Sequence, residues 1–98
     1  MSSPSIDFLT TLEQVIRERG AQPATHSYTA KLLAAGTRRI AQKVGEEGVE
    51  VALAATAGER EELLEETADL LYHLLVLLAD SDLSLSDAAA VLESRHGG

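Results

Sequence analysis

Residues 66–79, ETADLLYHLLVLLA, decide the fold class of this chain. The leucine and valine side chains of residues 70–78 would cover nearly every direction around an α-helix, and a helix that is apolar on all sides is a buried helix. Asp69 stands at the start of this run, so we expect its carboxylate to be buried or nearly so. The longest apolar stretch of the chain, residues 68–79, is too short to span a bilayer, and Asp69 and His73 interrupt it.

The composition favours an all-α protein with a single domain. A chain of 98 residues has room for one domain, residues 1–98, with a thin core of its own. Hydrophobic residues make up 45% and aromatic residues only 3%, so the core must be aliphatic, which suits helix packing better than strands. A fully apolar helix needs more cover than so short a chain can supply. We therefore expect a homodimer that completes the helical bundle.

Charge and cysteine content exclude several classes of function. The formal net charge of -8 argues against a nucleic-acid partner, because nucleic-acid-binding domains are usually basic. The absence of cysteine excludes a disulfide, a cysteinyl zinc site and a thiol nucleophile, and it fits the reducing cytosol. Residues 1–7 lack a basic region followed by an apolar run, which argues against a signal peptide. We expect a cytoplasmic protein without a membrane partner.

Helical periodicity and end signals predict four main helices and a short one. The predicted helices cover approximately residues 4–19, 28–35, 37–57, 59–79 and 84–96. Ser3 is expected to cap the first helix and Thr37 the third. Ser84 with Asp87 resembles a capping box for the last helix, and Gly58 marks the end of the third.

Acidic residues recur at helical spacing on two consecutive predicted helices. Glu47 and Glu50 share one face of the third helix, and Lys43 lies one turn before Glu47 on the same stripe. Glu66 and Asp69 share one face of the next helix in the same way. Antiparallel packing of the two helices would bring the acidic pairs together.

A divalent cation would remove the cost of burying such carboxylates, because unpaired buried charges are unfavourable and like charges repel. Ligands that are all oxygen suit Mg²⁺ or Mn²⁺ better than zinc. The Glu-x-x-His pair typical of di-iron bundles is missing, which weakens an iron interpretation. The alternative is that the acids form solvated helix faces, as we expect for Glu59, Glu61, Glu62 and Glu65.

Two glycines, Gly45 and Gly48, are interleaved with the glutamates of the third helix. Each costs about 1 kcal/mol relative to alanine in a helix interior. They suggest either a close approach of a ligand to the backbone or tight packing of one helix on another.

The acidic motifs resemble those of a known superfamily. Glu-Glu-x-x-Glu at residues 46–50 and Glu-x-x-Asp at residues 66–69 resemble the all-α nucleoside triphosphate pyrophosphohydrolases, which include MazG-like proteins. Within that superfamily, SYTAKLL at residues 27–33, KVGEE at residues 43–47 and DLLYH at residues 69–73 look like phosphoribosyl-ATP pyrophosphohydrolase. The resemblance covers approximately residues 6–93, and the SYTA and KVGEE segments are its more specific parts.

The resemblance implies hydrolysis of phosphoribosyl-ATP to phosphoribosyl-AMP and pyrophosphate, the second step of histidine biosynthesis. It also implies Mg²⁺ and a homodimer with intertwined helices. Some relatives are fused to a cyclohydrolase domain, for which this chain has no room, so we expect a monofunctional protein.

Position and resemblance together assign the metal ligands as Glu47, Glu50, Glu66 and Asp69. The metal would bridge phosphate oxygens of the nucleotide and offset the charge that develops in the transition state. Glu46 points about 100° away from Glu47 around the helix. It would orient or deprotonate the attacking water, or bind a second metal.

The candidates for substrate binding are Lys43, Arg39, Arg38, Lys31, Ser27 and His73. The cations among them would bind those phosphate oxygens whose negative charge the metal does not neutralise. Lys43 is the best placed, and its alternative role is an intrahelical ion pair with Glu47. The alternative role of His73 is that of a hydrogen-bonded core residue.

Two other functions compete with this interpretation. The same metal site would serve a house-cleaning pyrophosphatase that acts on noncanonical nucleotides, with different pockets for base and ribose. A non-catalytic dimeric scaffold would carry the same acids as solvated faces only.

Overall fold

The structure is a computed structural model that describes residues 4–97, and these residues form five helices without a strand. The helices are α1 (Phe8–Gly20), α2 (Tyr28–Ala35), α3 (Thr37–Ala57), α4 (Arg60–Asp80) and α5 (Leu85–His96). The prediction of an all-α fold with four main helices and a short one is therefore confirmed.

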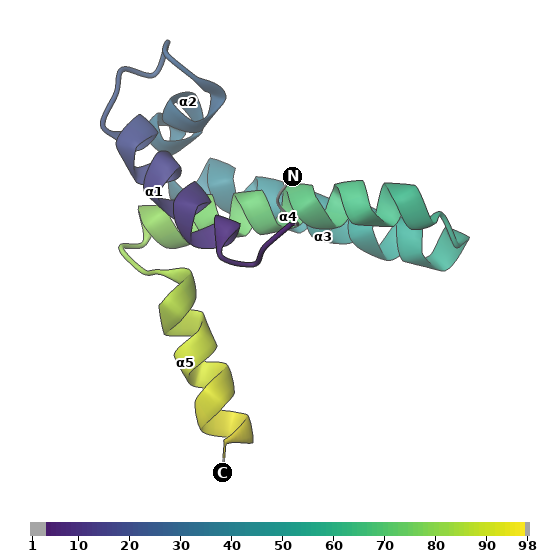
Figure 1. The fold of residues 1–98 in the computed structure, drawn as a ribbon. Coiled ribbons are helices and arrows are strands. Elements are labelled where there is room, and N and C mark those ends of the chain that lie inside the picture. Colours follow the sequence, from purple (N-terminus) through teal and green to yellow (C-terminus); the bar gives the residue numbers. More distant parts are fainter. Residues whose placement is uncertain (1–3, 98) are drawn as a thin grey trace.

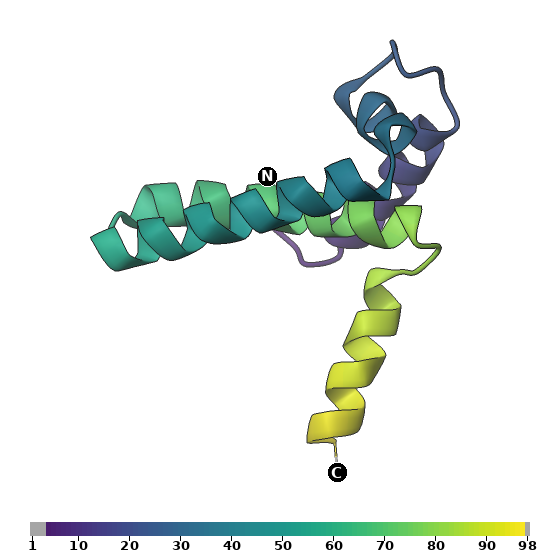
Figure 2. The ribbon, with the colours of Figure 1, turned by 180° about the vertical axis from the view of Figure 1, so that it is seen from behind.

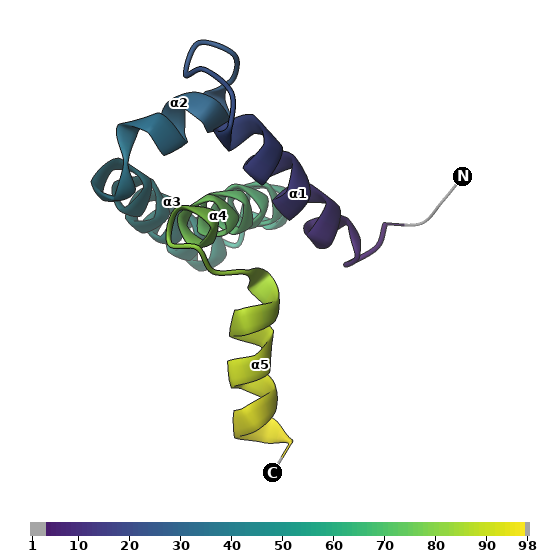
Figure 3. The same cartoon turned by 90° about the vertical axis from the view of Figure 1, so that its left-hand side faces the viewer.

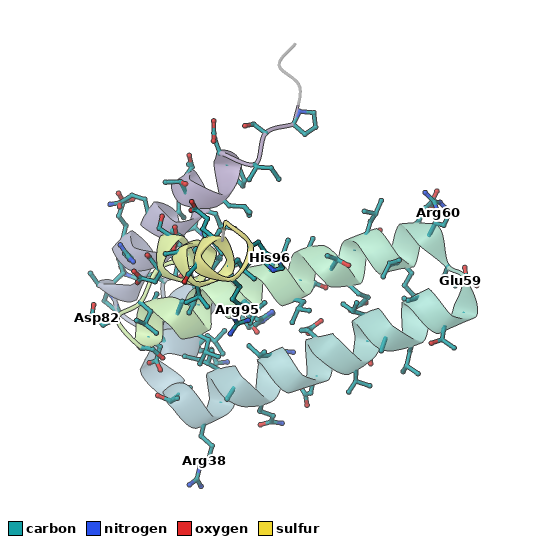
Figure 4. The ribbon with its side chains drawn as sticks, turned by 90° about the horizontal axis from the view of Figure 1, so that it is seen from below. Arg38, Glu59, Arg60, Asp82, Arg95 and His96 are labelled. Atoms are coloured by element: carbon teal, nitrogen blue, oxygen red, sulfur yellow. The ribbon has the colours of Figure 1, made fainter. Side chains whose placement is uncertain are left out.

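The long helices α3 and α4, each of 21 residues, form an antiparallel hairpin that organises the molecule (Figures 1 and 2). Glu59 and Arg60 mark the turn at one tip of this hairpin (Figure 4). At the opposite end, α2 connects α1 to the beginning of α3, as the view along the hairpin shows (Figure 3). Helix α5 projects away from the other four helices (Figure 1).

The core lies where α1 and α2 pack against the hairpin. Its buried side chains come from four helices and are Ile16, Leu32, Ile40, Leu75 and Val76. They are the aliphatic residue types that the composition leads one to expect. The core therefore fixes one end of the hairpin, while the end near Gly58 extends beyond α1 and α2 (Figure 1).

Local end signals explain where several helices stop and start. Gly58 ends α3 with a left-handed backbone, φ 73°, in which its N–H bonds to carbonyls of the last turn. The capping box of α5 is confirmed, because Ser84 Oγ accepts from the Asp87 N–H at 3.2 Å and Asp87 Oδ2 accepts from the Ser84 N–H at 2.9 Å.

Two predictions about helix starts are wrong. Helix α1 begins at Phe8, after Asp7, and not near residue 4; Ser3, its expected cap, lies outside the described residues. Thr37 is the first residue of α3 and does not cap it, because its hydroxyl donates to Asp80 Oδ2 at 2.6 Å instead. Helix α4 agrees with the approximate prediction of residues 59–79 to within one residue at each end, since it covers Arg60–Asp80.

The expected burial of α4 on all sides is also wrong for a single chain. Asp69 is exposed, and Leu71 and Leu74 remain 38% and 36% exposed. The reason is that α1, α2 and α3 cover only part of the circumference of α4. No helix within the described residues combines the length and the apolar character that crossing a membrane requires.

We expect Ile40→Ala to lower the free energy of unfolding by about 2–5 kcal/mol, because it leaves a cavity where a side chain is now 0% exposed. Chemical denaturation at a fixed protein concentration measures this change. The matched control is Ile6→Ala, the same substitution at a residue that is 81% exposed, which should change the free energy by less than about 0.5 kcal/mol. Equal losses in both variants would contradict the assigned core.

Candidate metal centre and nucleotide pocket

The antiparallel pairing of α3 and α4 brings carboxylates from both helices to one place. One oxygen each from Glu47 on α3 and from Glu66 and Asp69 on α4 lie within 4.8 Å of one another. Glu47 and Glu66 are partly buried between the helices, whereas Asp69 is exposed. The cluster is thus anchored on the hairpin and open to solvent on one side.

The electrostatics of this cluster disfavour three bare carboxylates. Partial removal of Glu66 from water raises its pKa above the ordinary value, and the contact with Glu47 raises it further. The charges of Asp69 and then Glu50 act in the same direction. Lys43 Nζ lies 3.4 Å from Glu47 Oε1, which offsets part of the negative charge.

The donor set fits a hard divalent cation. Its three candidate ligands are all carboxylates, and such oxygen ligands are preferred by Mg²⁺, Mn²⁺ and Ca²⁺. A cation there would also relieve the repulsion that raises the pKa of Glu66. The structure therefore provides an acidic site suited to a divalent metal.

Two predicted acids lie outside the group of three. Glu50 is exposed and close enough for its charge to act on Glu66. Glu46 is also exposed; it accepts a hydrogen bond from Gln42 at 3.2 Å and lies 3.8 Å from Lys43. The alternative role of Lys43, pairing within its own helix, is therefore present in the structure.

The glycines beside these acids do not pack against another helix of this chain. A methyl group added at Gly45 or Gly48 would contact nothing within 4 Å. Tight packing within the chain, one of the two explanations offered for them, is therefore wrong. The backbone surface next to Glu46 and Glu47 is open instead.

The predicted substrate-binding cations are only partly brought together. Lys31 and Arg39 line one pocket together with Tyr28, and Lys31 and Ser27 line a neighbouring pocket that also includes Tyr28. Ser27 is also the N-cap of α2, because its Oγ accepts from the Ala30 N–H at 3.0 Å. Arg38 points away from the bundle (Figure 4).

His73 lies in the interior, one turn after Asp69. It is 6% exposed, and each of its ring nitrogens has a partner. Nδ1 lies 2.8 Å from the backbone oxygen of Asp69, and Nε2 lies 2.9 Å from the hydroxyl of Tyr28. Its alternative role, that of a hydrogen-bonded core residue, matches this placement.

Sequence reasoning did not single out Tyr28, although its ring lines both pockets. The chain has only two tyrosines, Tyr28 and Tyr72, and one falls in each of two motifs that carry the resemblance. Their rings stack with centroids 6.3 Å apart, and the hydroxyl of Tyr72 bonds to Thr29. The scarcity of aromatic residues was the signal that could have identified Tyr28.

The fold and the site together define a class: an all-α protein with an acidic cluster suited to a divalent metal on a helical hairpin, and with a pocket that Lys31 and Arg39 line. Residues 9–96 match the family described as Phosphoribosyl-ATP pyrophosphohydrolase. This match covers most of the chain, and the chain belongs to that family.

Curated relatives agree with this membership. The chain is 62% identical over 94 residues to the histidine biosynthesis bifunctional protein HisIE of Photobacterium profundum, covering 95% of this chain and 45% of the relative. It is 61% identical over 89 residues to the protein of the same name from Salmonella typhimurium, covering 91% and 44%. The chain spans less than half the length of these relatives.

We expect the stability of the metal-free protein to depend on pH, because the negative charge of Glu66 is unfavourable in the folded state. Its pKa is raised in the folded state, so the folded state binds the proton more tightly and gains stability as the pH falls from neutral through that pKa. Glu66→Gln should therefore be more stable than the wild type at neutral pH, and the difference should shrink on acidification.

Thermal unfolding in chelator between pH 4 and pH 8 measures this effect, with Glu65→Gln as the control on the exposed side of the same helix. A lower melting temperature for Glu66→Gln at neutral pH would show that the carboxylate is not under repulsion there.

Proposed function

We propose that this chain hydrolyses phosphoribosyl-ATP to phosphoribosyl-AMP and pyrophosphate, the second step of histidine biosynthesis, with Mg²⁺ as its cofactor and Mn²⁺ as a substitute. The observation that carries the proposal is the convergence of Glu47, Glu66 and Asp69 in a chain of this family. Glu50, whose charge reaches Glu66, would complete the ligand set. The absence of cysteine supports the cytoplasm as the place of the reaction.

The metal would supply a counter-charge to the phosphate oxygens in the ground state and in the transition state. The residues of the chain supply the rest of the positive charge. Lys31 and Arg39 face one pocket and would bind the phosphates that the metal does not reach. Lys43 would exchange its pairing with Glu47 for a phosphate oxygen when the metal neutralises that glutamate.

Glu46 is the proposed general base. It would take a proton from the water that attacks the phosphorus, while the bond between the α- and β-phosphates breaks and pyrophosphate leaves. Its exposure and the open surface beside Gly45 leave space for water and phosphate at this point. Ser27 lines the neighbouring pocket and would contact the nucleotide there, whereas Arg38 would have to turn inward to do so.

Pyrophosphate release from phosphoribosyl-ATP, with Mg²⁺ and with chelator, tests the proposal. We expect release only with metal, and a loss of more than about a hundredfold in Glu47→Gln and in Asp69→Asn, because each removes a charged ligand. Glu65→Gln, an exposed glutamate outside the cluster, should retain full activity.

Two outcomes would point elsewhere. Equal hydrolysis of ordinary or noncanonical nucleoside triphosphates would replace the proposal with a house-cleaning pyrophosphatase. If calorimetry of folded protein detects no Mg²⁺ or Mn²⁺ binding, the acids are solvated faces and the chain is a scaffold.

We further propose that the protein is a homodimer in which a second copy covers the exposed side of α4. An apolar groove of about 200 Å³ runs beside this helix. Its lining residues are Leu9, Leu71, Leu74, Leu75, Leu77, Leu78, Leu85 and Ala88. Helix α5 projects beside it and exposes Val91 and Leu92, and exposed apolar surface of this kind favours association.

Light scattering should give the mass of a dimer for the wild type and of a monomer for Leu74→Glu, because the charge would be buried in the interface. Leu64→Glu is the matched control on the same helix, 72% exposed and outside the groove, and should stay dimeric. If Leu74→Glu were a dimer and Leu64→Glu a monomer, the interface would instead lie at the end of the hairpin near Gly58.

A further inference from the structure

The hydrogen bonds of His73 assign its protons. The backbone oxygen of Asp69 can only accept, so Nδ1 carries the hydrogen and donates it. With its hydrogen on Nδ1, a neutral imidazole has a free lone pair on Nε2, which would accept from the hydroxyl of Tyr28. Both ring nitrogens are therefore committed to protein partners, and the residue is too buried to contact a ligand in the pocket.

Tyr28 is anchored at one end and exposed at the other. Its hydroxyl is held by His73, while the residue as a whole is 52% exposed and lines both pockets. The Tyr28 and His73 rings also pack edge to face, with centroids 5.9 Å apart and planes at 80°. Tyr72 stacks on it at an interplanar angle of 29°. The Tyr28 ring thus forms part of the wall of both pockets, and its orientation depends on the buried His73.

The same contacts connect the pocket to the acidic cluster. Tyr28 belongs to α2, and His73 belongs to α4 one turn beyond Asp69. The path from the pocket wall to the backbone of Asp69 consists of two hydrogen bonds, of 2.9 Å and 2.8 Å. The Tyr28 ring is therefore tied to α4, the helix that carries Glu66 and Asp69.

We propose that His73 is a positioning residue for the nucleotide: it holds the Tyr28 ring as a preformed wall of the pocket that Lys31 and Arg39 line. The inference rests on the proposed function for its substrate. Without the anchor, the phenol ring would sample other rotamers, and binding would have to order it again. The consequence is weaker nucleotide binding with little effect on the chemical step.

Two substitutions remove the anchor from opposite sides. Tyr28→Phe deletes the hydroxyl and keeps the ring, and His73→Asn keeps a donor for the Asp69 oxygen while losing the reach to Tyr28. We expect each to raise KM for phosphoribosyl-ATP about three- to tenfold, with kcat within about twofold of the wild type. The double variant should be no worse than either single variant, because both remove the same interaction.

Two further variants separate positioning from a loss of stability. His73→Gln places an amide oxygen near the position of Nε2 and should restore most of KM. Tyr72→Phe keeps the ring that stacks on Tyr28 and removes the other tyrosine hydroxyl that bonds between the same two helices, the one bonded to Thr29. It should lower the melting temperature and leave KM unchanged, since Tyr72 lines neither pocket.

A readout without substrate keeps this proposal separate from the proposed function. In Tyr72→Phe protein, Tyr28 is the sole tyrosine of a chain that has no tryptophan, so its fluorescence anisotropy decay reports the motion of that ring. Adding His73→Asn should increase the motion, and adding His73→Gln should not. An unchanged decay with His73→Asn, or KM effects that add in the double variant, would overturn the positioning role even in an active enzyme. Increased motion in a protein that does not release pyrophosphate would support the positioning of Tyr28 and count against the proposed function alone.

Discussion

The antiparallel packing of α3 on α4 is the constraint on which the rest of the molecule depends. Each helix carries only part of the acidic cluster, with Glu47 on α3 and both Glu66 and Asp69 on α4. The left-handed turn at Gly58 reverses the chain, so that Glu47 meets Glu66 and Asp69. Repulsion between these charges disfavours folding. Burial of the aliphatic core, at the end of the hairpin away from Gly58, stabilises the fold and offsets this repulsion.

Helix α2 depends on the hairpin through polar contacts as well as apolar ones. Leu32 joins the core, while Tyr28 and Thr29 bond to His73 and Tyr72 of α4. Hydrogen bonds fix direction more closely than apolar contact does. The pocket that Tyr28 lines and the carboxylate cluster therefore share one supporting helix, α4, and the proposed second copy of the chain would cover the remaining apolar face of this helix.

Much of the fold could be predicted because its signals are local. The bounds of α2 and α3, the glycine that ends α3 and the capping box at Ser84 follow from residues within one turn of each helix end. The i, i+3 spacing of Glu66 and Asp69 likewise placed both acids on one face before the partner helix was known. Glu47 was expected opposite them because consecutive helices pack antiparallel.

The sequence by itself thus determined the helices and their order, and it singled out the three acids that meet across the hairpin together with Glu50, which lies outside that group. Only the tertiary structure decided that Asp69 is exposed, that Thr37 bonds to Asp80 instead of capping α3, and that His73 holds Tyr28. The physical reason is that burial and side-chain partners depend on which helix faces meet. Residues more than 40 positions apart make these contacts, and no local pattern encodes them.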